Sequence, residues 1–156
     1  MKKKAVIGIG NPLRSDDGIG IVLLEKLRQQ KKKLLPDLDL IDGGTGGMNL
    51  VHILEKYDKV LIVDAVDFGV NPGDIKVFNI LDVKSDKIPV AFSTHEDDLL
   101  KIIKLSKELK KCPDNIIIFG IQPKNVSFGQ KITEEINRSI EFIFKELEKE
   151  IFSLFG

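Results

Sequence analysis

The stretch KAVIGIGNPLRSDDGIG, residues 4–20, decides the fold of this chain. Its first half is a short apolar run that ends in glycines, which is typical of a buried β-strand. From residue 17 to residue 30, apolar side chains recur at helical spacing opposite a polar face, so a helix is expected there. A buried strand followed at once by a helix begins a strand–helix–strand unit, and this favours a parallel sheet.

The same alternation continues along the rest of the chain. Short apolar runs predict buried strands at 38–42, 60–64 and 115–120. Apolar residues at helical spacing predict helices at 47–57, 96–110 and 132–151. A weaker alternation over 75–80 predicts an edge strand, and the short turn before it fits a reversed direction. Crossover connections place helices on both faces of such a sheet, so we expect a mostly parallel α/β fold.

Size and composition restrict the class of protein. The chain has 156 residues, which predicts a single domain spanning 1–156. Hydrophobic residues make up 42% and charged residues 31%, as is typical of soluble globular proteins. No apolar run approaches the roughly 20 residues of a membrane span, so we expect no membrane insertion. The N-terminus lacks the apolar core of a signal peptide, and the one cysteine excludes a disulfide framework, so a cytoplasmic location is expected.

The charge balance argues against a nucleic-acid partner. The chain carries 24 basic and 24 acidic residues, and only three of the basic residues are arginine. Nucleic-acid binders usually carry a basic excess with arginines that grip phosphates. Tryptophan is absent, which leaves little material for stacking on bases. We therefore expect no binding to nucleic acid.

Polar and glycine residues follow three of the predicted strands. The first strand ends at Gly8-Ile9-Gly10-Asn11, the second at Asp42-Gly43-Gly44 and the third at Asp64-Ala65. In parallel α/β sheets, ligands bind beyond the carboxyl ends of the strands. These three ends are therefore expected to converge on one site.

The loop after the first strand carries adjacent carboxylates, Asp16 and Asp17. A dinucleotide-binding loop needs G-x-G-x-x-G, but Leu13 stands where the third glycine is required. Two carboxylates would repel a pyrophosphate and would attract a cation. Asp16 or Ser15 could instead cap the following helix, which leaves Asp17 for function.

Asp64 and His95 complete a possible metal-binding set. Asp64 closes an apolar strand, whereas Asp67 is as easily explained as a turn residue. His95 stands just before a predicted helix, whereas the other histidine, His52, lies within a helical stretch and is expected to be a surface or packing residue. Two carboxylates and one imidazole on separate loops suit nickel or zinc and leave coordination positions open. No serine nucleophile motif is present, and Cys112 is expected to be structural.

At these residues the chain resembles the hydrogenase maturation endopeptidases, which trim the large-subunit precursors of nickel–iron hydrogenases. The matching segments, in the family's order and spacing, are GIGNPLRSDDGIG (8–20), DGGTGG (42–47), LIVDAVDFGVNPG (61–73), STHE (93–96) and FGIQP (119–123). Two stretches within them, VDAVDFGVNPG and FGIQP, especially resemble the branch that acts on hydrogenases related to formate-linked and coenzyme F420-reducing enzymes. The family's metal-contacting set falls on Asp17, Asp64 and His95. The loop Asp42-Gly43-Gly44-Thr45-Gly46 is a candidate substrate-binding segment.

The resemblance implies both a fold and a reaction. The implied fold is a three-layer α/β/α domain of the phosphorylase/hydrolase-like type, with a mostly parallel five-stranded sheet that has one antiparallel strand. The implied reaction removes the C-terminal extension of the precursor after nickel insertion, and Asp17, Asp64 and His95 recognise the nickel. That nickel is carried by the precursor, which is the expected partner, and no organic cofactor is implied.

Three other functions compete with this interpretation. Peptidyl-tRNA hydrolases also begin with a strand and a GxGNP segment, but they need a histidine soon afterwards and a basic surface, and this chain has neither. A flavodoxin-like nucleotide or flavin carrier is disfavoured by the acidic first loop. A non-catalytic protein that senses or delivers nickel without cutting remains an alternative, and a cleavage assay distinguishes it.

Overall fold

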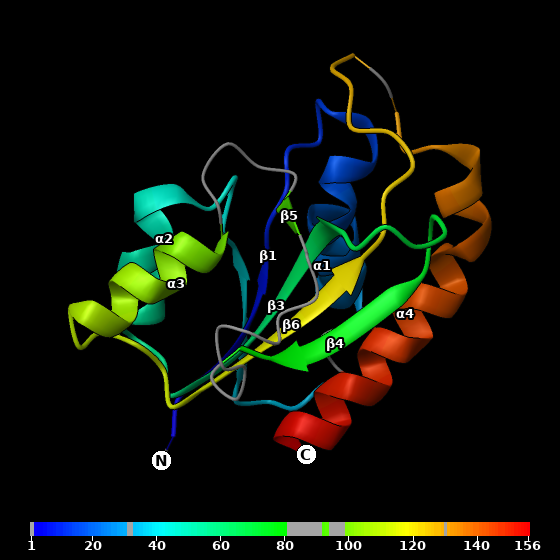
Figure 1. Ribbon diagram of the computed structural model, residues 1–156. Coiled ribbons are helices and arrows are strands. Elements are labelled where there is room, and N and C mark those ends of the chain that lie inside the picture. Colours follow the sequence, from blue (N-terminus) through cyan, green and yellow to red (C-terminus); the bar gives the residue numbers. More distant parts are fainter. Residues whose placement is uncertain (1, 31–32, 81–91, 94–98, 130) are drawn as a thin grey trace.

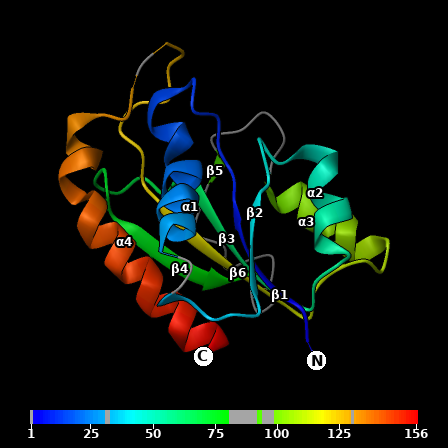
Figure 2. The same cartoon turned by 180° about the vertical axis from the view of Figure 1, so that it is seen from behind.

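A sheet lies between two pairs of helices, with α2 and α3 on one face and α1 and α4 on the other (Figure 1, Figure 2). The structure is a computed structural model that describes residues 2–30, 33–80, 92–93, 99–129 and 131–156. The strands are β1 (Lys4–Gly8), β2 (Leu38–Asp42), β3 (Lys59–Asp67), β4 (Ile75–Asn79), β5 (Phe92–Ser93) and β6 (Asn115–Ile121). The helices are the 3-10 helix η1 (Ser15–Gly18), α1 (Ile19–Gln29), α2 (Gly47–Leu54), α3 (Leu99–Glu108) and α4 (Glu134–Phe155).

The predicted three-layer fold is confirmed. The strands follow the order β2-β1-β3-β6-β4, and all these pairs are parallel except β4 with β6. β4 is reversed because only a short turn separates it from β3, and a parallel return would need a long crossover. The short strand β5 pairs with the end of β3 and lies off this path.

The two faces of the sheet bury separate apolar cores. Side chains alternate along a strand, so neighbouring residues point to opposite faces. Leu61 and Val63 pack on the side of α1 and α4, and Val60 and Ile62 pack on the side of α2 and α3. This explains why the predicted strands are continuous apolar runs, since both of their faces are covered.

Several elements end a few residues away from the predicted bounds, and two of these differences bear on the site. β3 continues to Asp67, three residues past Asp64, because β6 and β5 pair with this extension. The first helix begins at Ile19, and residues 15–18 form the tighter turn η1. None of the described helices has the length and apolar character that crossing a membrane requires.

Gly20 sets how closely η1 and α1 approach the sheet. A Cβ atom at this position would lie 2.2 Å from the carbonyl oxygen of Ile9 and 2.4 Å from that of Val63. Such distances are far shorter than van der Waals contact, so only glycine fits here. The start of α1 therefore rests directly on β1 and β3, and this packing brings the acidic first loop to the end of β3.

Candidate functional site

The carboxyl ends of β1, β2 and β3 are hydrogen-bonded to one another. The N–H of Gly43 donates to the carbonyl of Gly8 at 2.8 Å, and the N–H of Gly10 donates to the carbonyl of Gly44 at 2.8 Å. On the other side, the N–H of Ile9 donates to the carbonyl of Val63 at 2.9 Å. We call this region, made of residues 9–18, residues 42–46 and Asp64, the carboxyl edge.

Asp17 lies in η1 and is completely buried. Its Oδ2 accepts a hydrogen bond from the backbone N–H of Asn11 at 3.0 Å, which closes the loop that follows β1. The side chain is therefore held in place by the turn that it closes. A carboxylate held in this way is positioned before any ligand arrives.

Asp64 lies near the carboxyl end of β3 and is also completely buried. Alternation along β3 places it on the same face as Val60 and Ile62, on the side of α2 and α3. Its neighbour across the ladder to β6 is Gly120. η1, which carries Asp17, packs against β3. The structure therefore brings two buried carboxylates from separate elements to one edge of the sheet.

Asp16, next to Asp17, has a structural role that the sequence analysis assigned differently. The helix that follows has no side-chain cap, so Asp16 and Ser15 do not serve as its N-cap. The Asp16 carboxylate instead accepts the backbone N–H groups of Lys124 at 2.9 Å, Asn125 at 3.1 Å and Thr133 at 2.8 Å. The Thr133 hydroxyl also donates to it, at 2.9 Å to Oδ2. Asp16 thus ties the first loop to the segment that leads into α4.

Thr133 is of a residue type that commonly caps a helix. It does occupy the N-cap position of α4, but its side chain makes no capping hydrogen bond because the hydroxyl points to Asp16. Further bonds join the same two loops, including Ser15 Oγ to the carbonyl of Lys131 at 2.7 Å and Arg14 Nε to the carbonyl of Val126 at 3.1 Å. The segment between β6 and α4 is therefore held against η1 by the hydrogen bonds of Arg14, Ser15 and Asp16.

Gln122 is a buried side chain whose role the sequence analysis missed. Its Oε1 accepts the backbone N–H of Phe68 at 2.7 Å, and its Nε2 donates to Asp67 Oδ1 at 3.1 Å. Asp67 Oδ1 also accepts the N–H of Gly69 at 2.9 Å, which supports its interpretation as a turn residue. Gln122 stands in the motif FGIQP, so the motif was visible, but nothing in the sequence showed which loop the side chain would hold.

The glycine-rich segment 42–46 forms a tight turn beside the first loop. Asp42 Oδ1 accepts the N–H of Gly44 at 2.8 Å, so this carboxylate shapes the turn. Gly44 has φ +59° and Gly46 has φ +86°, a backbone region that favours glycine. No heavy atom lies within 4 Å of where a Cβ of Gly44 would be, so this part of the turn faces open space. Gly43 is buried and Thr45 is exposed.

His95 lies outside the described residues. The strand just before it, β5, is paired antiparallel with β3, with Ser93 opposite Val66 and Phe92 opposite Asp67. Within the described ranges, no three His, Cys, Asp or Glu side chains lie together as a metal site. Asp17 and Asp64 therefore account for only part of the expected ligand set.

The remaining candidates lie away from the carboxyl edge. His52 is exposed on α2, which is one of the two positions expected for it. Cys112 precedes β6, at the opposite edge of the sheet, and packs against the core on the side of α2 and α3. Burial raises the pKa of the Cys112 thiol, which disfavours the reactive thiolate. These positions fit a surface histidine and a structural cysteine.

Comparisons with known proteins agree on one family. A family model described as hydrogenase maturation protease matches residues 21–150. The hydrogenase expression/formation protein HupD from Bradyrhizobium diazoefficiens is 31% identical over 142 residues, which cover 86% of this chain and 70% of that protein. The crystal structure of the NiFe hydrogenase maturation protease HycI from Thermococcus kodakarensis is similar with a TM-score of 0.70 at 25% identity, over 96% of this chain and 92% of that one. The endopeptidase HybD from E. coli shares the fold, with a TM-score of 0.77 at 21% identity over 97% of this chain and 93% of that one.

Proposed function

Because the chain belongs to the hydrogenase maturation protease family and is a peptide hydrolase, we propose that it removes the C-terminal extension of a nickel–iron hydrogenase large-subunit precursor after nickel insertion. One observation supports this most: Asp17 and Asp64, both fully buried, come from separate elements to the same edge of the sheet. Burying two carboxylates near one another is costly, and a bound cation would offset that cost, so their placement favours a cationic partner.

We propose that nickel reaches this site as part of the precursor and that the chain needs no organic cofactor. Carboxylate and imidazole ligands suit borderline divalent ions, and three such ligands leave coordination positions open. Cysteine thiolates of the precursor can fill these positions. The nickel is then shared between the two proteins, and only a loaded precursor presents it.

The pairing of β5 with β3 supports His95 as the third ligand. Ser93 lies opposite Val66, and in an antiparallel pair a step forward on one strand is a step back on the other. Val66 follows Asp64 by two residues on β3, and His95 follows Ser93 by two residues in the sequence. This register is the reason to prefer His95 over His52, which is exposed on α2.

The neighbouring loop is proposed to hold the peptide. The turn Asp42-Gly43-Gly44-Thr45-Gly46 is bonded to the first loop, and its glycine backbone allows a bound chain to approach closely. A metal bound next to a peptide carbonyl can polarise it or lower the pKa of an attacking water. In both cases Asp17 and Asp64 position the metal, and the turn at residues 42–46 positions the peptide bond that is cut.

The test is cleavage of a nickel-loaded precursor by single variants of the protein. Asp17→Asn, Asp64→Asn and His95→Ala are each expected to abolish processing while circular dichroism stays native. His52→Ala and Asp114→Asn serve as matched controls, since these residues lie away from the carboxyl edge, and they should process normally. Normal processing by any two of the three site variants would overturn the assignment. Nickel-dependent binding without a shortened large subunit would indicate the non-catalytic alternative.

A further inference from the structure

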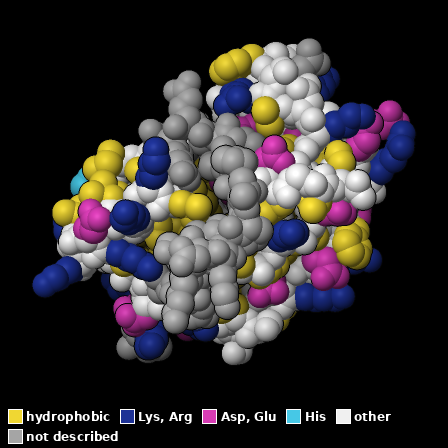
Figure 3. Space-filling model, viewed as in Figure 1, with side chains coloured by type: hydrophobic (Ala, Val, Ile, Leu, Met, Phe, Trp, Pro, Cys, Tyr) yellow, Lys and Arg dark blue, Asp and Glu magenta, His cyan; other side chains and the backbone are white. Residues whose placement is uncertain are grey.

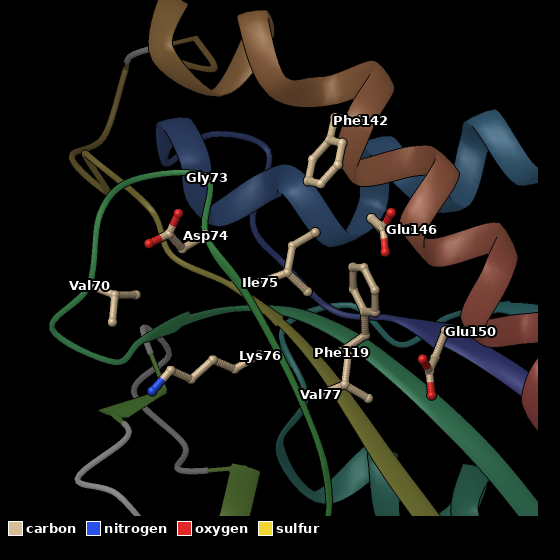
Figure 4. A pocket seen from close by; sticks show the side chains of 10 residues that line it. All are labelled: Val70, Gly73, Asp74, Ile75, Lys76, Val77, Phe119, Phe142, Glu146 and Glu150. Carbon is tan, nitrogen blue, oxygen red and sulfur yellow. The ribbon is translucent and has the colours of Figure 1, made fainter.

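A groove runs along the outer strand of the sheet, between β4 and α4 (Figure 4). Its volume is about 450 Å³, and Phe119 forms part of its floor, between Ile75 and Val77 of β4 and the side chains of α4. Ile75 pairs with Ile121, the last residue of β6, so the groove begins at the same end of the sheet as the carboxyl edge. It then continues down the side of the molecule along α4.

The backbone of β4 has hydrogen-bonding groups that point away from the sheet. The N–H of Gln122 donates to the carbonyl of Asp74 at 2.9 Å, and the N–H of Ile80 donates to the carbonyl of Ile116 at 3.0 Å. Because bonded and non-bonded pairs alternate in an antiparallel ladder, the N–H and C=O groups of Ile75 and Val77 face outward. Within the part of the chain that the structure describes, no strand pairs with this edge.

The side chains of the groove combine apolar surface with negative charge. Val77 is 41% exposed and Phe142 is 62% exposed, which is high for large apolar residues. Glu146 and Glu150 stand on the α4 wall next to them (Figure 4), and acidic and apolar side chains adjoin on this flank of the molecule (Figure 3). Two lysines also stand at the groove. Lys149, which is 75% exposed, pairs with the half-buried Glu146 at 3.1 Å, and Lys76 lines the β4 side with its Nζ 5.6 Å from the centre of the Phe68 ring. Ion pairs with an exposed partner are weak, so the α4 wall keeps its negative character.

We propose that the groove binds an extended peptide segment of the substrate, which adds to β4 as a further strand. The outward groups of Ile75 and Val77 would pair with its backbone, as in other cases of strand addition. Its side chains on the α4 face would alternate between an apolar one against Val77 and Phe142 and a basic one against Glu146 and Glu150. The inference rests on the proposed function only in assigning this segment to the substrate.

The charges distinguish this occupant from a second copy of the chain. Two β4 strands paired edge to edge about a two-fold axis would place both α4 helices on the same face of the joined sheet. The acidic residues Glu146 and Glu150 of both copies would then face one another, which costs free energy. A peptide with lysine or arginine gains from the same charges.

The first test uses a labelled eight-residue peptide, Thr-Val-Thr-Lys-Thr-Val-Thr-Lys, and a second peptide with glutamate in place of lysine. Fluorescence anisotropy with the full chain is expected to give about tenfold tighter binding of the lysine peptide. Phe142→Ala and Glu150→Gln should each weaken it by about threefold to fivefold. Phe152→Ala and Glu148→Gln, on the same helix but outside the groove, should leave it unchanged.

The second test addresses the backbone. Val77→Pro removes one outward N–H and no bond of the ladder to β6, and proline is tolerated on an edge strand. It is expected to weaken binding of the lysine peptide by about fivefold, equivalent to one hydrogen bond. In the wild-type protein, the same peptide should slow hydrogen exchange of the Ile75 and Val77 amides.

Several outcomes would overturn the proposal. These are equal binding of the two peptides, no binding of either, no response to Phe142→Ala and Glu150→Gln, or unchanged exchange at Val77. Dimerisation that Phe142→Ala abolishes would assign the groove to a second copy instead. Precursor cleavage separates this proposal from the proposed function, because groove variants should raise KM with kcat unchanged. If the wild type cleaves the precursor and the groove variants have the same KM, the groove proposal alone fails.

Discussion

We predict that Asp16→Ala lowers the free energy of unfolding by about 3 kcal/mol, whereas Asp17→Asn changes it by less than about 1 kcal/mol. The two aspartates are adjacent and both fully buried, so burial alone would not separate them. The hydrogen bonds that the two carboxylates accept distinguish them. Asp16 accepts three backbone N–H groups from residues beyond β6, which an alanine cannot accept. Asp17 accepts the N–H of Asn11, which the amide oxygen of an asparagine can still accept.

The magnitude follows from counting the donors that would lose their acceptor. The N–H groups of Lys124, Asn125 and Thr133 each lose a bond worth about 1 kcal/mol net in Asp16→Ala. The Thr133 hydroxyl loses its acceptor too, but it can rotate towards water and adds little. Bonds to a charged acceptor are stronger, but these donors are only partly buried and can regain water, so we retain the lower value. For a domain of this size, the change corresponds to a fall in Tm of about 6–12 °C.

Urea unfolding followed by circular dichroism measures both variants on the same scale. The midpoint should fall clearly for Asp16→Ala with an unchanged slope, and it should stay near wild type for Asp17→Asn. The midpoint of Asp16→Asn should lie between those two variants. The asparagine keeps one oxygen acceptor, but its NH2 group would face an N–H donor that it cannot bond. Equal losses in Asp16→Ala and Asp17→Asn, or a loss below about 1 kcal/mol for Asp16→Ala, would refute the structural role of Asp16.

Three more predictions follow from the packing. Burial, and then the hydrogen bond to Asp39, raise the pKa of Tyr57 to about 12. Because the sequence has only one tyrosine, the absorbance at 295 nm should rise with a midpoint near pH 12. The folded-state pKa exceeds the unfolded one, so this contribution to stability is present below about pH 10 and is lost as pH rises towards about 12; a midpoint near 10 would contradict it. Cys112→Ser should process the precursor normally, and thiol reagents should not inhibit cleavage by the wild-type protein. Stoichiometric loss of cleavage on modification of Cys112 would contradict its structural role. Gln122→Leu should cost about 2 kcal/mol by urea unfolding, because Phe68 loses its acceptor; a loss under about 0.5 kcal/mol would count against this role.

The fold could be predicted from the sequence because each strand is a local signal. The run VLIVD is apolar on both faces, and a buried parallel strand requires this. Asp17 and Asp64 could be placed near one another without coordinates, because parallel strands bring their carboxyl ends to one edge. Even the reversed direction of β4 follows from the short turn at 71–74.

The roles that escaped prediction depend on distant partners. Asp16 is bonded to residues 108 to 117 positions further along the chain, so its sequence neighbours suggested only a helix cap. Gln122 holds a loop more than 50 positions earlier, around Phe68. β5 has only two residues and is defined by its pairing with β3. A strand this short has no periodicity that the sequence could reveal.

The most direct test of the central claim compares an apo-precursor with a nickel-loaded precursor under identical conditions. Both are incubated with the wild-type protein, and the mass of the large subunit is measured over time. We predict that only the nickel-loaded precursor is shortened, and that Asp64→Asn shortens neither. Equal shortening of both precursors would show that nickel is not the recognition signal, and it would contradict the role proposed for Asp17, Asp64 and His95.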